Sequence, residues 1–431
     1  MHVPTGAPVY LLQIETLPQV LTWVDSPIHN ERGLPHSLEH LLVGKGATGR
    51  YMNLLSSMRL SSYSAATNDD FVYYGMSSGA GTDTFFELFH SLLSALYAPD
   101  FLDTEAEREF YHFSVSTDQN GKKTLFEGGT VYNEMLAREN RYDYYNQLNR
   151  RVFGSQTPYG FESGGAPEEM RGVTPAEIRS FHQKWYRLGP TTGFIFSFPP
   201  GQNVPETLQQ ISLELRRFTH SPVAPQAQPL GGPKYPIHPS DQVEPGIYPF
   251  PAANNSDPGD VQLAWKPVKT SSLLQLKLLE LLCHGLGGGE DSLLQKILVD
   301  TKTRTSDLGA TAVDSYVFRE NRAGFPAATV EISGIPGNKL TLASLDQLRQ
   351  LVTGTIKEVS RYADHSASLL DFNQSILSFA TNRRRAQDVW TRSLQALIPI
   401  RRIRSGSLIS NSWNSTPPLC APFHKTQFGR R

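Results

Sequence analysis

Apolar residues recur along this chain with two different periods, which predict helices and strands in alternation. Within residues 83–97, apolar side chains return every three or four positions, the spacing of one helix face: Phe85, Phe86, Phe89, Leu92, Leu93 and Leu96. We interpret this stripe as core packing. Residues 9–14 and 19–24 are short β-rich runs separated by Leu17-Pro18, and we expect them to form two strands that pair with each other.

The same two patterns continue to about residue 361. Further predicted strands cover 71–74, 193–198, 261–265 and 327–332. Further predicted helices cover 36–44, a segment from about 104 into the His112 region, a segment from Pro175, 273–283 and 344–361. The helix after Thr174 begins with a capping box, because Glu177 follows Thr174 by three positions and Pro175 takes the first helical position.

Length and proline content predict more than one domain. At 431 residues the chain is too long for one ordinary hydrophobic core. Prolines recur every few residues over 221–251 with little apolar periodicity, which is typical of an extended linker. We therefore predict a first domain at 1–217, a linker at 218–251 and a second domain at 252–400. Residues 401–431, rich in Arg, Ser and Pro, are predicted to be a disordered tail.

Composition argues against several classes of partner. The net charge is −1, 19% of residues are charged and the mean hydropathy is −0.34, so we expect neither nucleic acid nor membrane among the partners. No apolar run approaches the ~20 residues of a membrane span. Cys283 and Cys420 are far apart, as in a reducing compartment. The N-terminal residues resemble neither a secretory signal nor a transit peptide. We expect a cytoplasmic protein, or a mitochondrial-matrix protein if a presequence is missing.

The strongest chemical signal is the stretch from His36 to His40, an H-x-x-E-H pattern of the inverted zincin type. In a helix over 36–44, His36 and His40 lie one turn apart on one face and can hold one divalent metal, ordinarily zinc. Glu39 lies beside that face, where its carboxylate could take a proton from water. Pro35 starts this helix without costing a hydrogen bond. The alternative is a surface helix with two solvated histidines.

A second acidic stretch runs from Glu127 to Met135. Glu127 and Glu134 are seven positions apart, which in a helix is two turns, so both side chains are expected on one face. Gly128-Gly129 is costly inside a helix and indicates either close backbone packing or a helix start. The alternative is two solvated carboxylates.

These motifs together resemble the M16 metallopeptidases, the pitrilysin and insulin-degrading group, and most of all their presequence-protease branch. The resemblance rests on residues 33–40, on 131–135 with Glu127 before them, and on 158–160 with 163–165 and the Phe181-His182 and Trp185-Tyr186 pairs. Glu134 lies 94 positions after His40, a gap close to that of the branch. The likeness covers most of residues 5–215, and residues 258–385 more loosely.

The resemblance implies an α+β fold of two M16-type α/β domains, each with a mainly antiparallel sheet covered by helices. It implies one zinc ion per chain, with His36, His40 and Glu134 as ligands. It further implies Glu39 as the base that activates water, and Glu127 as an acid that supports the site from outside the ligands.

The family binds the substrate backbone along an edge strand beside the metal. Here the resemblance implies that this strand lies around Ser64, Ala65, Ala66 and Thr67. The family usually has asparagine at the position of Ser64, so the side-chain contact differs at that point.

The expected function is a zinc metalloendopeptidase that hydrolyses short unfolded peptides. Presequence-type enzymes are about twice as long as this chain, and their second half supplies an Arg and a Tyr for which we find no counterpart here. We therefore expect a homodimer or pairing with a second M16-like half. Two alternatives stay open: a half-length M16-like protein that binds zinc but is inactive alone, and a non-catalytic partner subunit.

Overall fold

The computed structural model of the chain describes residues 1–58, 60–219, 246, 248, 254, 257–265, 273–318, 326–362, 366–374 and 376–377, without the side chains of 139–145 and 273. Most of the predicted linker at 218–251, the end of the predicted second domain and the whole predicted tail at 401–431 lie outside these residues. The boundaries proposed for the linker and the tail therefore stay predictions.

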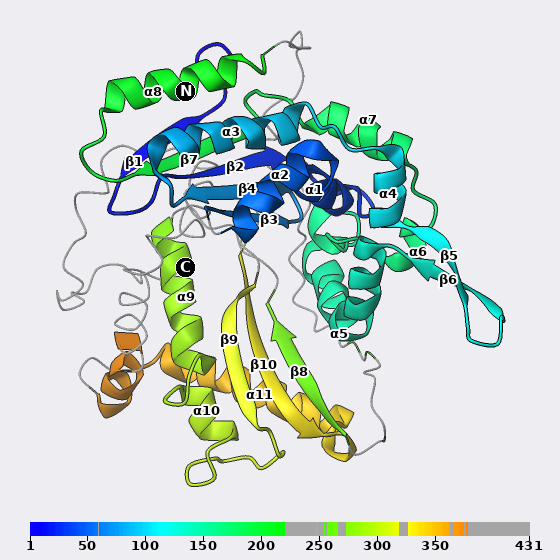
Figure 1. Cartoon of the computed structure of the whole chain (residues 1–431). Coiled ribbons are helices and arrows are strands. Elements are labelled where there is room, and N and C mark those ends of the chain that lie inside the picture. The colour runs from blue at the N-terminus through cyan, green and yellow to red at the C-terminus, as the bar shows by residue number, and fades with distance from the viewer. Residues whose placement is uncertain are drawn as a thin grey trace.

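The described elements form a first unit up to residue 219 and a second unit from residue 257 (Figure 1). The strands of the first unit are β1 (Val9–Gln13), β2 (Gln19–Asp25), β3 (Ser61–Thr67), β4 (Phe71–Ser78), β5 (His112–Thr117), β6 (Lys123–Gly128) and β7 (Thr192–Phe198). Its helices are α1 (Leu34–Gly44), α2 (Gly46–Ser57), α3 (Gly81–Tyr97), α4 (Asp103–Phe110), α5 (Thr130–Phe153), the 3₁₀ turn Pro158–Gly160, α6 (Pro167–Met170), α7 (Pro175–Trp185) and α8 (Val204–Arg216).

The second unit contains β8 (Pro258–Ala264), α9 (Leu273–Gly287), α10 (Leu293–Leu298), β9 (Ala312–Phe318), β10 (Ala327–Pro336), the 3₁₀ turn Gly337–Lys339 and α11 (Leu342–Val359). Its three strands pair in the antiparallel order β8-β10-β9. Leu348 and Val352 of α11 belong to the same buried cluster as Val330 and Ile332 of β10, so this helix covers the sheet with an apolar face.

The first unit is organised around a five-stranded sheet in the order β1-β7-β2-β4-β3. The expected pairing of residues 9–14 with 19–24 is wrong, because β7 lies between β1 and β2. All seven residues of β7 (TGFIFSF) are buried, and a strand buried on both faces belongs inside a sheet. The β1–β7 pairing is parallel, whereas every other pairing among the described strands is antiparallel.

Helix α3 packs on this sheet through the predicted apolar stripe. Phe85 and Phe89 are fully buried, and their rings contact those of Phe196 and Phe198 in β7. Burying one such side chain contributes about 1.5–3 kcal/mol. Aromatic side chains on two elements distant in sequence thus hold the helix layer to the sheet.

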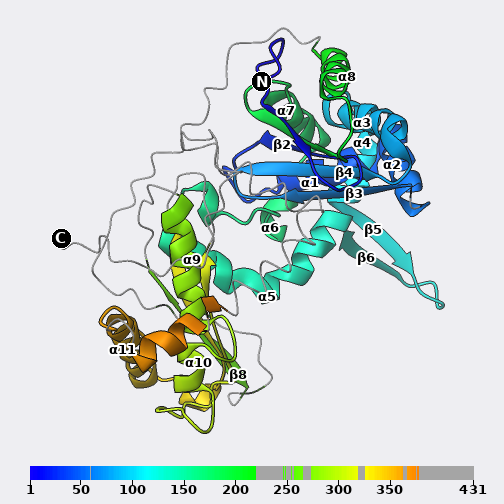
Figure 2. The same cartoon turned by 90° about the vertical axis from the view of Figure 1, so that its left-hand side faces the viewer.

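Helix α5 links the two units. It starts beside α1 and extends toward the second sheet, and the β5–β6 hairpin projects away from the rest of the first unit (Figure 2). Val152 and Phe153 at the end of α5 form a buried cluster with Tyr159 and with Ala327 of β10. The start of α5 is therefore positioned by the first unit, and its end contacts the second.

Candidate metal centre

The H-x-x-E-H stretch lies in α1, as predicted. The helix is buried on nearly all sides, and its buried residues include His36, Leu38, Glu39 and Leu41. The rings of His36 and His40 lie edge to face with their centroids 4.8 Å apart, as expected for positions one turn apart. The predicted helix therefore presents both imidazoles to one side.

The entry into α1 depends on a close approach of two glycine backbones. Gly33 is in the left-handed conformation, with φ of 66°, immediately before the helix. A Cβ on Gly33 would lie 2.6 Å from the carbonyl oxygen of Gly164, and a Cβ on Gly165 would lie 2.6 Å from the Cα of Gly33. The loop around Gly164 can therefore reach α1 only because these positions have no side chain.

Replacing Gly33 with alanine is expected to lower the free energy of unfolding by about 2 kcal/mol or more. The left-handed conformation costs a residue with a Cβ about 1–2 kcal/mol, and the clash with Gly164 adds to it. Gly172→Ala is the matched control, because no heavy atom lies within 4 Å of its added Cβ. Urea unfolding of the two variants compares them directly, and equal midpoints would contradict the close-approach argument.

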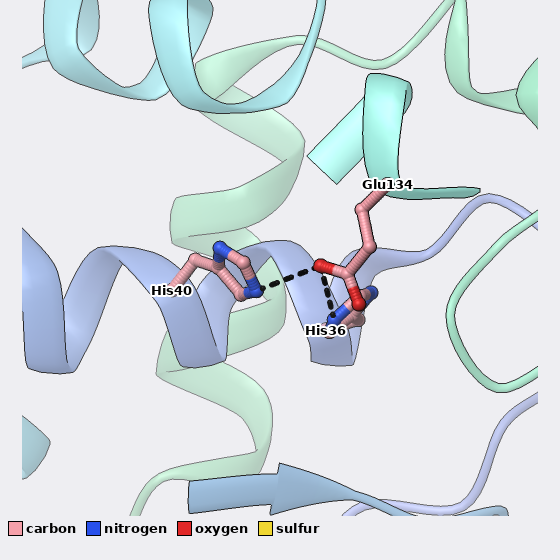
Figure 3. A group of neighbouring side chains, drawn as sticks. All are labelled: His36, His40 and Glu134. Atoms are coloured by element: carbon pink, nitrogen blue, oxygen red, sulfur yellow. Dashed lines mark ion pairs between the residues drawn. The ribbon is translucent and has the colours of Figure 1, made fainter. Parts of the chain in front are cut away.

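The third member of the group comes from α5. The Oε2 atom of Glu134 lies 3.7 Å from Nε2 of His36 and 3.5 Å from Nε2 of His40 (Figure 3). One ligand atom from each of the three residues lies within 4.8 Å of the other two. Two elements separated by more than eighty positions of sequence thus bring two imidazoles and a carboxylate to one point.

The outer nitrogen of each imidazole is already bound to the protein. Nδ1 of His36 donates to the carbonyl oxygen of Gly164 at 3.2 Å, and Nδ1 of His40 donates to Glu109 at 3.0 Å. A neutral imidazole protonated at Nδ1 carries its lone pair on Nε2. Both Nε2 atoms therefore point their lone pairs toward the carboxylate of Glu134.

Two imidazole nitrogens and a carboxylate oxygen that converge on one point are a donor set that fits a divalent cation. Two histidines and one glutamate form a common donor set of catalytic zinc sites, which leave a further position open. Burial lowers the pKa of His36, and the neighbouring His40 lowers it further. Burial also acts to lower the pKa of His40, but the hydrogen bond to Glu109 and the surrounding carboxylates raise it overall.

The other oxygen of Glu134 is bound to a cation of the protein. Nη2 of Arg138, one turn further along α5, lies 2.6 Å from Oε1 of Glu134. One oxygen of the Glu134 carboxylate thus faces the two histidines, and the other pairs with the guanidinium of Arg138.

Glu39 lies on the buried side of α1, next to the histidines. Its carboxylate accepts a hydrogen bond of 2.7 Å from the hydroxyl of Thr67. Burial raises the pKa of Glu39, and the hydrogen bond from Thr67 opposes this rise. A carboxylate with a raised pKa is better matched to proton transfer near neutral pH than an exposed one.

The segment Ser64–Thr67 lies in β3, at one edge of the sheet. Among the described strands β3 pairs only with β4, so its other side is open to a further strand. Ser64 is exposed, while Ala65, Ala66 and Thr67 are half-buried. The hydroxyl of Thr67 reaches Glu39, so this edge runs beside the candidate centre.

Glu127 does not share a helix face with Glu134, so that expectation is wrong. Glu127 lies in β6, and α5 begins only at Thr130. Gly129 has φ of 138°, and a Cβ there would lie 2.3 Å from the carbonyl oxygen of Phe110. The two glycines therefore turn the chain into the helix, as the helix-start interpretation proposed, and they break the helical spacing.

The carboxylate of Glu127 is held in a cluster of its own. It accepts hydrogen bonds from Arg171 at 2.7 Å, Tyr132 at 2.5 Å and Tyr111 at 2.7 Å. The hydrogen bonds from Arg171, Tyr132 and Tyr111, the first being the strongest, lower the pKa of Glu127 to about 2. Tyr132 lies in the first turn of α5, two residues before Glu134, so this cluster holds the start of the helix that carries Glu134.

Replacing Glu127 with glutamine is expected to weaken metal binding by about tenfold, the lower end of what residues outside the ligands contribute. The amide keeps the shape but loses the charge that holds Arg171, so the start of α5 loosens. Zinc affinity measured by competition with a chelator tests this expectation. Arg171→Gln should give a similar loss, and an unchanged affinity in both variants would show that the cluster does not support Glu134.

Glu109, which accepts a hydrogen bond from His40, was not among the site residues predicted from the sequence. Helix α4 contains three acidic residues before it, of which Asp103 and Glu107 are exposed, whereas Glu109 is 5% exposed. Glu109 shares its buried side with Ala106 and Phe110, at helical spacing. An acidic residue on the apolar stripe of a predicted helix was the signal that could have found it.

No helix in the described part of the chain has both the length and the apolar character to cross a membrane.

Comparison with known proteins gives both sequence and fold relatives. The chain is 28% identical over 204 residues to the mitochondrial presequence protease of Schizosaccharomyces pombe, covering 46% of this chain and 20% of that protein. It is 24% identical over 374 residues to presequence protease 1 of Arabidopsis thaliana, covering 83% of this chain and 32% of that protein. The matches thus span a third or less of the length of these relatives. No protein-family model matches the chain.

Among solved structures, the peptidase M16 inactive domain from Pseudomonas fluorescens superposes with a TM-score of 0.60 at 15% identity. The match covers 93% of this chain and 89% of that one. At this identity the match establishes the fold, a mixed α/β arrangement with mainly antiparallel sheets, as predicted. Together, the shared fold and the sequence matches make the chain similar to M16 peptidases, and over part of their length to the presequence proteases.

Proposed function

We propose that the chain is a zinc-dependent endopeptidase that hydrolyses short unstructured peptides. The observation that carries this proposal is the convergence of His36, His40 and Glu134 within 4.8 Å, with Glu39 buried beside them. These three side chains would hold one zinc ion per chain. A bound zinc would supply Lewis acidity, which makes water a nucleophile near neutral pH and polarises a carbonyl.

The protein side chains supply the proton chemistry. Glu39 takes a proton from the attacking water and later returns it to the leaving amine, the role expected of a buried carboxylate with a raised pKa. The hydrogen bond from Thr67 keeps the carboxylate in one orientation during both steps. The second acid of the sequence analysis, Glu127, acts through the start of α5 and not on the reacting atoms.

The open edge of β3 provides the substrate site in this proposal. An extended peptide can add to the edge around Ser64 to Thr67 by main-chain hydrogen bonds, with its backbone next to Glu39. Only a chain without secondary structure of its own can pair in this way. The proposed substrates are therefore unfolded peptides, and folded proteins are excluded.

A second candidate is a protein that binds zinc but is inactive alone, or that serves as a non-catalytic partner. Two observations favour it: the matches span at most 32% of the presequence proteases compared here, and the M16 domain from P. fluorescens is described as inactive. In this case activity would need a homodimer or a second M16-like half to complete the substrate site. The proposed location is cytoplasmic, or mitochondrial as for the S. pombe relative.

The test uses a quenched unstructured peptide and a folded protein as substrates across a range of enzyme concentrations. A missing opposing wall would misplace the peptide, and an error of about 1 Å can cost on the order of 100-fold in rate. We expect cleavage of the peptide only, with a specific activity that rises with concentration as two copies pair. Efficient cleavage of the folded protein by a monomer would contradict the proposed substrate site. Zinc binding without cleavage at any concentration would favour the inactive half.

A further inference from the structure

Glu109 is a buried carboxylate whose two oxygens have separate partners. Oε1 accepts a hydrogen bond from Nδ1 of His40 at 3.0 Å. Oε2 is 2.7 Å from Nζ of Lys45 and accepts a hydrogen bond of 3.0 Å from the hydroxyl of Thr130. The carboxylate therefore cannot rotate without breaking contacts with the end of α1 and with the start of α5.

These partners favour the ionised form of the Glu109 carboxylate. Nζ of Lys45 and the hydroxyl of Thr130 both point at Oε2, and a cation and a hydroxyl donor at this distance favour the ionised carboxylate. An ionised carboxylate accepts hydrogen bonds and donates none. The proton between Glu109 and His40 must then belong to Nδ1 of the histidine, which leaves Nε2 with its lone pair.

His40 needs such support more than His36 does. The side chain of His40 is 23% exposed, against 9% for His36, so packing restrains its ring less. His36 is oriented by a backbone carbonyl that the close approach of Gly33 and Gly165 holds in place. Glu109 is the corresponding group for His40, and Lys45 neutralises it so that its Oε1 stays directed at the imidazole.

We propose that Glu109 is the positioning residue of His40: it fixes the ring orientation and the Nδ1-protonated tautomer, so that Nε2 faces Glu134 and is available to a divalent cation. The inference rests on the proposed function only for the identity of the cation. A carboxylate that holds a metal-binding histidine in this way typically contributes 10- to 100-fold to metal affinity.

The competing explanation is that Glu109 merely ties α1, α4 and α5 together. Glu109→Gln keeps the shape and can still accept from Nδ1, whereas Glu109→Ala removes the acceptor. Lys45→Met removes a partner of Oε2 without touching the contact to His40. Glu107→Gln is the matched control, because Glu107 lies on the same helix and is exposed.

The first measurement is the zinc affinity of each full-length variant, by competition with a chelator, next to its thermal unfolding without metal. We expect a loss of about 10-fold for Glu109→Gln and about 100-fold for Glu109→Ala, and no change for Glu107→Gln. Lys45→Met should lower thermal stability with a smaller loss of zinc affinity than either Glu109 variant. If Glu109→Ala fails to fold, Glu109→Gln decides alone. A folded Glu109→Gln that binds zinc as tightly as the parent overturns the inference.

The second measurement is independent of zinc. Two-bond ¹H–¹⁵N spectra of the metal-free protein, with His40 assigned through His40→Gln, report its tautomer. We expect His40 of the parent protein to be protonated at Nδ1. The tautomer should shift toward Nε2 protonation in Glu109→Ala, and Glu109→Gln should show a mixture of the two tautomers. An Nε2-protonated His40 in the parent would overturn the inference. A parent that shows the expected tautomer but binds no zinc would instead refute the proposed function.

Discussion

Replacing Glu39 with glutamine is expected to abolish peptide hydrolysis while one zinc ion per chain stays bound. Glutamine keeps the size of the side chain and can still accept from Thr67 at the position of Oε2, but it cannot take a proton from water. Loss of a general base typically costs 10²- to 10⁴-fold in rate. The measurement is kcat on a quenched peptide, together with the zinc content of the same sample.

Thr67→Val is the companion variant to Glu39→Gln. It removes the hydroxyl that orients Glu39 and leaves the carboxylate in place, so we expect a smaller loss of kcat and full zinc content. Loss of zinc from Glu39→Gln would contradict this account, because it would mean that Glu39 is a ligand and that one of the other three residues is not.

Replacing His36 or His40 with alanine is expected to remove the zinc ion. In the proposed site each histidine would supply one of three protein ligands, and the remaining imidazole and carboxylate are fewer than the three protein ligands of a catalytic zinc site. The loss of affinity should exceed the 10- to 100-fold expected for residues outside the ligands. Glu134→Gln should behave in the same way, because an amide oxygen is a poorer ligand than a carboxylate and leaves Arg138 without its ion pair.

His90→Ala is the control for these three variants. His90 lies on α3 beside Glu214 and is not among the residues that converge on the centre. Metal analysis after gel filtration should give one zinc per chain for His90→Ala and less than a tenth of that for the ligand variants. Full zinc content in His36→Ala would show that the metal binds elsewhere in the chain.

The local signals in the sequence predicted most elements of the described fold. The helix with the H-x-x-E-H stretch, the apolar stripe of α3 and the capping box before α7 were all identified, because each depends on residues within one or two turns. The pairing of β1 with β7 was not. It joins residues more than 180 positions apart, and hydrophobic periodicity within either strand carries no information about its neighbour.

Only the part of the candidate centre that lies on one helix could be predicted from residue spacing alone. His36 and His40 share a helix, so their spacing determines that they face the same way. Glu134 could be assigned only through the family resemblance, because it reaches the histidines across the interface of α1 and α5. Glu127 was placed on the wrong element because two glycines interrupt the helical spacing between it and Glu134.

Contacts made by side chains outside the motif could not be predicted. Thr67 was predicted only as part of the edge strand that binds the substrate backbone. In the structure its hydroxyl also contacts Glu39. Glu109 gave a weak signal, an acidic residue on an apolar helix face, and its partner His40 lies on another helix. Such contacts depend on how elements pack, which is decided by the whole core and not by the residues on either side of a motif.

The most direct test of the proposed function is to remove the metal and return it in measured amounts. The full-length chain is stripped with a chelator, zinc is added back stepwise, and the initial rate on the quenched peptide is recorded at each step, with Glu39→Gln treated in parallel. We predict that the rate rises in proportion to zinc and levels off at one zinc per chain, while Glu39→Gln takes up the same zinc and stays inactive. Hydrolysis by the zinc-free chain, or equal hydrolysis by Glu39→Gln, would contradict the assignment of this protein as a zinc peptidase.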